Sequence, residues 1–230
     1  METNNDIIYN LTKGILSECK EKSIDIRLFG SVALLFLDSS IIESIGKYSK
    51  IIADIDIIVK PNQIKELECL FMNRGYLANR RVKMLYGNER RSFYLENNLS
   101  IDVFIGNITL CQNLSILDRF DETYPTITTS DLFLTKIQKI NLSDSDVYSI
   151  NYILKFGIDF EYIIKLSSES WNWWKTLNKN IPFLLENNIS EDNKRLLVDL
   201  MNEISSTEKT RSWKLRNFIG EKRSWYNNVE

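Results

Sequence analysis

The amino-acid sequence predicts an α+β protein in which a mixed sheet with helices is followed by a helical region. Strand-like alternation of apolar residues occurs only before residue 125, and beyond Pro125 the apolar residues recur at helical spacing alone. The chain has 230 residues, of which 43% are hydrophobic and 26% charged, an ordinary globular composition. Because this length suffices for two small domains, we expect a mixed-sheet core over residues 1-125 and a helical domain over residues 126-230.

Helices and strands alternate in the part of the core that precedes residue 75. The expected elements are a helix at 6–19, a strand at 25–29, a helix at 32–37, a strand at 51–59 and a helix at 62–73. Apolar residues at 3.6-residue spacing predict the helices, and alternation predicts the strands. Pro61 ends the second strand, and Gly75 ends the last helix. Residues 38–50 form a polar excursion without a clear pattern.

Three further strands complete the expected sheet, at 82–86, 92–95 and 99–105. Gly87-Asn88 and Asn97-Asn98 lie between them, where turns are needed. In the helical region, the segments Thr128 to Asp131 and Ser143 to Asp146 are typical of helix caps.

The chain contains no histidine, which excludes Ser-His-Asp and Cys-His catalysis and any zinc site with histidine ligands. Its three cysteines are scattered and form no CxxC pair, so we expect a reducing, cytoplasmic setting. No stretch is long and apolar enough to span a membrane, and the net charge of −2 argues against a nucleic-acid-binding surface over the whole chain. An enzyme of this composition depends on carboxylates, hydroxyls, lysine and arginine, and carboxylates favour Mg²⁺ or Mn²⁺.

Three aspartates interrupt two otherwise apolar strands. Alternation places Asp54 and Asp56 on one face of the 51–59 strand, and Asp102 interrupts the 99–105 strand in the same way. Clustered carboxylates repel each other unless a cation lies between them. If the two strands are neighbours, the three aspartates form a site for two metal ions roughly 3.5–4 Å apart. The alternative is that Asp54 and Asp56 face solvent, since an Asp-x-Asp pair alone is a weak motif.

Two further features suit the binding of phosphate groups. Gly30-Ser31 lies at a strand-to-helix junction, where backbone N–H groups and the Ser31 hydroxyl can hold a phosphate; a glycine turn with a serine cap is the alternative. Residues 74–91 carry six cations against Glu89, a net charge of +5 between the two aspartate strands. Arginine suits bidentate phosphate contact, so we favour Arg90 and Arg91, with a solvated surface as the alternative.

The order of these parts resembles the nucleotidyltransferase superfamily with the polymerase-beta-like catalytic core. The matching segments are Leu28-Phe29-Gly30-Ser31, then Ala53 to Val59 around Asp54 and Asp56, then Ser100 to Ile105 around Asp102. The resemblance covers roughly residues 25 to 155 and is specific as a set of motifs. Gly30 and Asp54 lie farther apart than is usual in the family, which makes residues 38–50 an insertion.

The segment Ser130 to Gln138, followed by Asp146, is similar to the lysine-bearing helix of bacterial AbiEii-like nucleotidyltransferases, a group with toxin members of toxin–antitoxin pairs. The resemblance implies that Lys136 faces the phosphates of the nucleotide; a solvated helix lysine is the alternative. It assigns no role to Asp146.

The resemblance implies a metal-dependent enzyme that moves an NMP from an NTP such as ATP to an acceptor hydroxyl and releases pyrophosphate. The implied catalytic and metal-binding residues are Asp54, Asp56 and Asp102, and the implied NTP-binding residues are Gly30, Ser31, Arg90, Arg91 and Lys136. The acceptor stays open between a small hydroxylated molecule, the end of a tRNA and a protein. A non-catalytic nucleotide-binding or interaction protein with the same fold is the alternative from another class. The nucleotide base and the oligomeric state are not indicated.

The C-terminal third combines aromatic and basic residues. It contains all five tryptophans, and residues 209–223 carry six cations against Glu221, a net charge of +5. Such a surface suits an RNA backbone, although aromatic residues at helical spacing more often form a core. We expect residues 126-230 to close one side of the nucleotide cleft and to select the acceptor.

Overall fold

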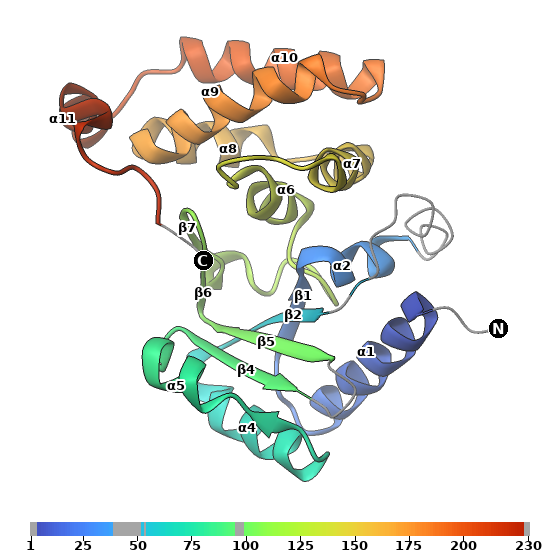
Figure 1. The fold of residues 1–230 in the computed structure, drawn as a ribbon. Coiled ribbons are helices and arrows are strands. Elements are labelled where there is room, and N and C mark those ends of the chain that lie inside the picture. The colour runs from blue at the N-terminus through green and yellow to red at the C-terminus, as the bar shows by residue number, and fades with distance from the viewer. Residues whose placement is uncertain (1–3, 39–51, 53, 95–98, 228–230) are drawn as a thin grey trace. The chain divides into compact units, whose positions relative to one another are not determined.

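The computed structural model describes residues 4–38, 52, 54–94 and 99–227, and it confirms the predicted α+β fold class (Figure 1). The chain forms two compact units, which we describe separately. The first comprises Met1–Thr109 and Leu114–Thr128, and the second comprises Leu110–Asn113 and Thr129–Glu230. Residues 39–50 of the predicted insertion and the predicted Asn97-Asn98 turn lie outside the described residues.

The first unit is built on a five-stranded mixed sheet in the order β1-β2-β5-β4-β3. The strands are β1 (Ile26–Phe29), β2 (Asp54–Val59), β3 (Leu77–Ala78), β4 (Arg90–Tyr94) and β5 (Ser100–Ile105). The central strands β2 and β5 are parallel neighbours, whereas all other pairings are antiparallel. The two strands that carry the aspartates are therefore adjacent, as the predicted site requires.

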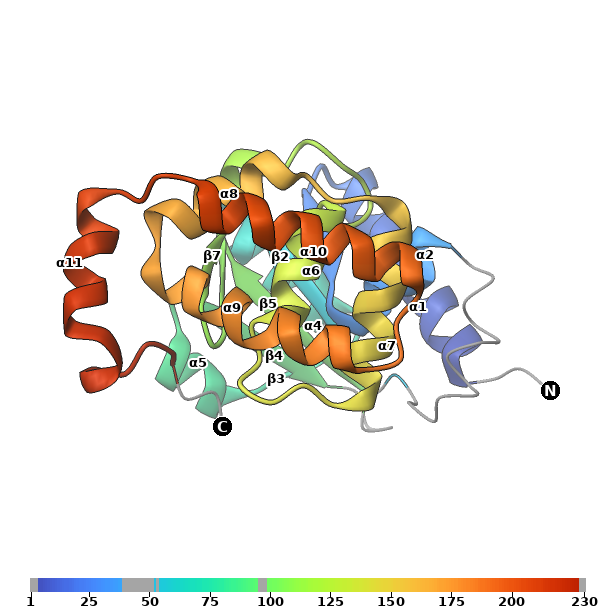
Figure 2. The same cartoon turned by 90° about the horizontal axis from the view of Figure 1, so that it is seen from above.

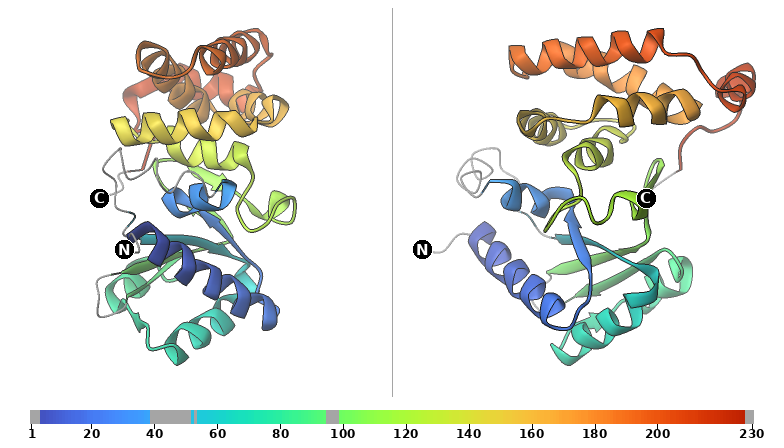
Figure 3. Two further views of the ribbon diagram at one scale, coloured as in Figure 1. Left: turned by 90° about the vertical axis from the view of Figure 1, so that its right-hand side faces the viewer. Right: turned by 180° about the vertical axis from the view of Figure 1, so that it is seen from behind.

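Two helices cover one face of this sheet, α1 (Asn4–Glu21) and α4 (Ile64–Asn73) (Figures 1 and 3). Phe71 of α4 packs edge-on against Phe93 of β4, with 5.1 Å between the ring centroids. An ion pair between Arg74 and Glu18 connects the end of α4 to α1. A third helix, α2 (Gly30–Leu37), follows β1 directly and packs against β1 and β2.

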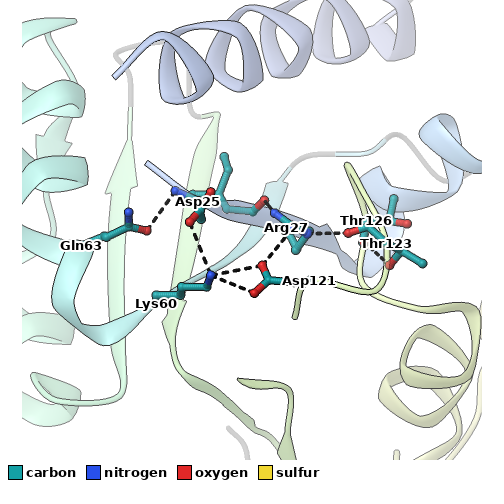
Figure 4. A network of polar contacts seen from close by, with 8 residues as sticks. Asp25, Arg27, Lys60, Gln63, Asp121, Thr123 and Thr126 are labelled. Carbon is teal, nitrogen blue, oxygen red and sulfur yellow. Dashed lines mark hydrogen bonds and ion pairs between the residues drawn. The ribbon is translucent and has the colours of Figure 1, made fainter. Parts of the chain in front are cut away.

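The outer edge of β1 is covered by the segment that ends the first unit. The N–H of Leu28 donates to the carbonyl of Pro125 at 2.8 Å, and the N–H of Ile127 donates back to Leu28 at 3.0 Å. Beside this contact, Asp121 accepts from Arg27 at 3.4 Å and from Lys60 at 3.1 Å (Figure 4). Hydrogen bonding to Asp121 raises the pKa of Lys60, whereas burial lowers the pKa of Arg27. This polar network explains why the first unit extends past the sheet.

The predicted strand at residues 82–86 is wrong, because this segment belongs to helix α5 (Arg80–Tyr86). The Asn79 side chain caps the helix by accepting hydrogen bonds from the N–H groups of Arg81 and Val82. None of the helix residues is buried, so the apparent alternation reflects no sheet face. A two-stranded sheet of β6 (Asn107–Thr109) and β7 (Asn113–Ser115) was also missed.

The second unit is mainly helical (Figure 2). Its α-helices are α6 (Thr129–Ile137), α7 (Asp144–Ile153), α8 (Phe160–Glu169), α9 (Trp171–Glu186), α10 (Glu191–Ser206) and α11 (Arg211–Ile219). Helix α10 packs on α8 and α9, and α11 contacts the same two helices. The predicted cap at Ser143 is confirmed as a capping box with Asp146. Among the helices that the structure describes, none has the length and hydropathy to cross a membrane.

Tryptophan side chains form a large part of the core of the second unit. Trp171, Trp213 and Trp225 make one buried cluster, and Trp174 packs against it with its ring centroid 5.1 Å from that of Trp213. Trp173 is buried as well and donates from its indole nitrogen to the carbonyl of Asn113 at 3.2 Å. Core packing therefore accounts for these aromatics.

Candidate functional site

The three aspartates lie on one face of the sheet in the first unit. Asp54 and Asp56 are two residues apart on β2, and Asp56 lies directly opposite Asp102 of β5 in the parallel register. All three are half-buried, whereas Ile55, Ile57, Ile101 and Val103 on the opposite face are fully buried. Since side chains alternate along a strand and paired residues share a face, the sheet places three carboxylates next to one another.

Gly30 follows β1 and lies against Asp56. Its φ of +69° is in the left-handed region that favours glycine. A Cβ added to Gly30 would lie 2.9 Å from Cγ of Asp56 and closer still to Oδ2, which is too close for real atoms. Only glycine therefore lets the start of α2 approach this carboxylate. Ser31 is the next residue, half-buried in the first turn of α2.

Arg90 of β4 forms an ion pair with Asp102. Its Nη2 donates to Oδ2 of Asp102 at 2.6 Å. The guanidinium carbon lies 5.0 Å from the centroid of the Phe104 ring, and Nε is buried without a hydrogen-bond partner. The guanidinium is thus held by one N–H···O contact and leaves a buried donor unsatisfied, which is costly.

Arg91 lies on the opposite face of the sheet from the three aspartates, because neighbouring residues on β4 alternate. It pairs with Glu68 of α4 and donates to the carbonyl of Gly87. Arg91 is therefore not part of the proposed site. Other cations of the basic stretch are used similarly: Arg74 pairs with Glu18, and Lys83 pairs with Glu68 at 3.2 Å.

The donor chemistry of the three aspartates suits a hard divalent cation, since Mg²⁺ and Mn²⁺ prefer carboxylate oxygens. The backbone of Gly30 packs directly against the Asp56 carboxylate, where any side chain would clash. As they stand, the side chains are not gathered around one point: within the described ranges, no three carboxylates or cysteines are grouped as a metal site. Asp102 is instead paired with Arg90 of the neighbouring strand β4, and this ion pair explains why its carboxylate is not grouped with the other two.

Lys136 and Asp146 belong to the second unit. Lys136 lies in the last turn of α6 and is only 7% exposed, so it is not a solvated surface lysine. Asp146 accepts from Lys139 at 2.6 Å and from the Ser143 hydroxyl at 2.7 Å. Burial disfavours its ionised form, but these hydrogen bonds outweigh burial and lower the pKa of Asp146. Its contacts give Asp146 the role of capping α7.

The basic C-terminal stretch is only partly available to a partner. The Arg216 guanidinium donates to the carbonyls of Gly220 and Arg223 and lies 4.6 Å from the Trp171 ring centroid. Lys214 pairs with Glu208 at 3.4 Å. Phe218 is 90% exposed on the same helix. Arg216 therefore stabilises the C-terminal fold, and Lys214 and Phe218 remain accessible.

One residue of the site was not anticipated from the sequence: Ser92 lies opposite Asp102 on β4. The signal was strand alternation, because Arg90 and Ser92 share the face of Asp102 once β4 begins at Arg90. Phe104, which alternation places on that same face, lies under the guanidinium of Arg90.

No family model matches the chain, and no curated protein matches it. Among solved structures, the fold is similar to that of an antigenic nucleotidyltransferase-like protein from Paracoccidioides brasiliensis, with 11% sequence identity and a TM-score of 0.41 over 91% of this chain and 95% of that chain. At this level of similarity, function has to be inferred from the side chains themselves.

Proposed function

We propose that this chain is a metal-dependent nucleotidyltransferase, which moves an NMP from an NTP to an acceptor hydroxyl and releases pyrophosphate. The observation that carries the proposal is the placement of Asp54, Asp56 and Asp102 on one face of adjacent strands, with the backbone of Gly30 against Asp56. Neighbouring half-buried carboxylates repel one another, so the arrangement lowers stability unless positive charge offsets it. The binding of a divalent cation and a triphosphate explains why the carboxylates are grouped on this face.

In this proposal Asp54, Asp56 and Asp102 hold the metal. A divalent cation bound there would neutralise charge on the triphosphate and make the α-phosphorus a better electrophile. The acceptor oxygen forms a bond to the α-phosphorus while the bond to the pyrophosphate oxygen breaks, and pyrophosphate leaves with that electron pair. Asp102 accepts the proton of the acceptor hydroxyl.

The phosphate contacts come from groups near the aspartates. The N–H groups of Gly30 and Ser31 stand at the start of α2, where the helix dipole favours an anion. Arg90 supplies the positive charge that balances the leaving group. The resemblance to AbiEii-like enzymes adds Lys136, and that assignment and the family itself are part of the proposal. A cytoplasmic setting is also part of it, since Cys19, Cys69 and Cys111 are free thiols.

For the acceptor, we retain a small hydroxylated molecule and the end of a tRNA. Accessible Lys214 and Phe218 on α11 support an RNA contact, because a cation and an aromatic ring are the elements that bind a nucleic-acid backbone and its bases. The structural use of Arg216 weakens that support. We retain the proposal that residues 126-230 select the acceptor.

The deciding experiment incubates the full chain with each α-labelled NTP, Mg²⁺ and a cell extract, and then identifies the labelled product. We expect labelling from one or more NTPs and none with Asp54→Asn or Asp56→Asn. The matched control is Asp118→Asn, which removes an exposed aspartate of the same unit and should leave labelling unchanged.

The non-catalytic alternative predicts a different result. A nucleotide-binding protein without turnover would gain thermal stability from Mg²⁺ plus an NTP and would label no acceptor in any extract. Stabilisation without labelling, retained after Asp56→Asn, would therefore overturn the proposed catalysis.

A further inference from the structure

Arg90 pairs with Asp102, one of the three proposed metal ligands, so its positive charge opposes the binding of a metal ion there. Asp102 lies on β5, between β2 with Asp54 and Asp56 on one side and β4 with Arg90 on the other. Arg90 pairs with Phe104, two residues from Asp102 on the same face, and reaches Asp102 diagonally. A single carboxylate therefore has a cation from β4 on one flank and two carboxylates on the other.

The ion pair between Arg90 and Asp102 is accessible and incompletely satisfied. The side chains are 32% and 15% exposed, so neither charge is sealed from solvent. One N–H donates to Asp102, and the buried Nε has no hydrogen-bond partner. Arginine binds a carboxylate best through two parallel N–H···O contacts, which this geometry does not provide. Arg90 is thus held in place by a contact that another cation can replace.

We propose that Arg90 and a divalent cation compete for Asp102, so that metal binding releases the Arg90 guanidinium to the triphosphate. This inference rests on the proposed function, because it requires the metal site of Asp54, Asp56 and Asp102. Without a cation, Arg90 offsets the charge of the third carboxylate. When a cation binds, Asp102 loses much of its attraction for Arg90, and the phosphate oxygens offer the guanidinium a bidentate partner. Arg90 is therefore a positioning residue before it is a phosphate ligand.

The first test measures Mn²⁺ binding to the full chain from the electron paramagnetic resonance signal of the free ion. Removing the competing cation with Arg90→Met should tighten Mn²⁺ binding roughly two- to fivefold, the change expected for losing a partly exposed ion pair. Arg91→Met is the matched control, because Arg91 is the neighbouring arginine on the opposite face. It should leave Mn²⁺ affinity unchanged. Arg90→Gln serves as a second variant if Arg90→Met fails to fold.

The second test uses inorganic tripolyphosphate with Mn²⁺ as the probe, measured by isothermal titration. Here Arg90→Met should weaken binding, the opposite sign to its effect on Mn²⁺ alone. Asp102→Asn provides a double-mutant cycle: once Asp102 is neutral, Arg90→Met should no longer tighten Mn²⁺ binding.

The outcomes separate this inference from the proposed function. Wild-type protein that binds Mn²⁺ no more weakly than Arg90→Met overturns the competition but leaves the metal site intact. Failure of both proteins to bind Mn²⁺ overturns both. Tighter Mn²⁺ binding by Arg90→Met with unchanged tripolyphosphate binding overturns the release of Arg90 to phosphate.

Discussion

Replacement of Gly30 by alanine tests how closely the backbone approaches Asp56. Two costs add at this position. The φ of +69° is unfavourable for alanine by roughly 1–2 kcal/mol. The new Cβ would also lie 2.9 Å from Cγ of Asp56, and overpacking of this kind costs about 1–3 kcal/mol. We therefore expect Gly30→Ala to lower the free energy of unfolding by about 2–5 kcal/mol.

Gly75→Ala is the matched control. Gly75 has a φ of +83°, yet a Cβ added there would meet nothing within 4 Å, so this change measures the backbone cost alone. Calorimetric melting should show the lower melting temperature for Gly30→Ala, by roughly 2–4 °C for each kcal/mol of difference in a chain of this size.

Removing Asp56 isolates the contact. In an Asp56→Ala background the Cγ and Oδ2 atoms are gone and only the contact with Cβ at 3.1 Å remains. Gly30→Ala should then cost clearly less than in the wild-type chain and approach the roughly 1–2 kcal/mol of Gly75→Ala. Equal melting temperatures for Gly30→Ala and Gly75→Ala in the otherwise wild-type chain, with NTP-dependent stabilisation retained by both, would refute the close approach of Gly30 to Asp56.

Neutralising Asp54 with Asn should raise the melting temperature of the metal-free protein slightly, because carboxylate repulsion falls, and should remove any stabilisation by Mg²⁺ plus an NTP; a wild type that gains none contradicts the metal site. Asp146→Asn should cost about 1 kcal/mol at pH 7. Burial opposes ionisation of Asp146, but the hydrogen bond from Lys139 lowers its pKa below the usual 3.8. Its stabilising effect is therefore present above that value and lost as pH falls through the lowered pKa, so acid unfolding curves of the two proteins should converge below about pH 4. For a tRNA acceptor, Lys214→Glu with Lys222→Glu should abolish labelling of tRNA and leave transfer to a small molecule unchanged; unchanged tRNA labelling at low and high salt would exclude the basic C-terminal stretch from the acceptor site.

The aspartate strands were predictable because their pattern is local. Each combines apolar alternation with a single acidic interruption, so the face of Asp54, Asp56 and Asp102 follows from spacing alone. Their adjacency does not, since β2 and β5 are separated in sequence by α4, α5 and β4. Pairing of distant strands depends on the whole fold.

The two wrong assignments fall in short segments, where a few residues give little periodicity to read. Val82, Met84 and Tyr86 alternate as a strand would, but the cap at Asn79 and the lack of burial favour a helix. The expected strand at 92–95 begins two residues after the observed start of β4 at Arg90. For this reason Arg90 and Arg91 were not predicted to lie on opposite faces of the sheet. The partner of each arginine, Asp102 or Glu68, is likewise a tertiary contact that no spacing rule gives.

The uneven distribution of tryptophan gives the protein a natural spectroscopic label. All five indoles lie between residues 171 and 225, within the second unit, and the first unit contains none. Intrinsic fluorescence excited selectively at tryptophan therefore reports on the helical unit alone, whereas circular dichroism reports on both. Denaturation followed by the two signals will reveal whether the units unfold together or one after the other. A ligand that binds the second unit beside these indoles will change their fluorescence, which provides a search for the acceptor.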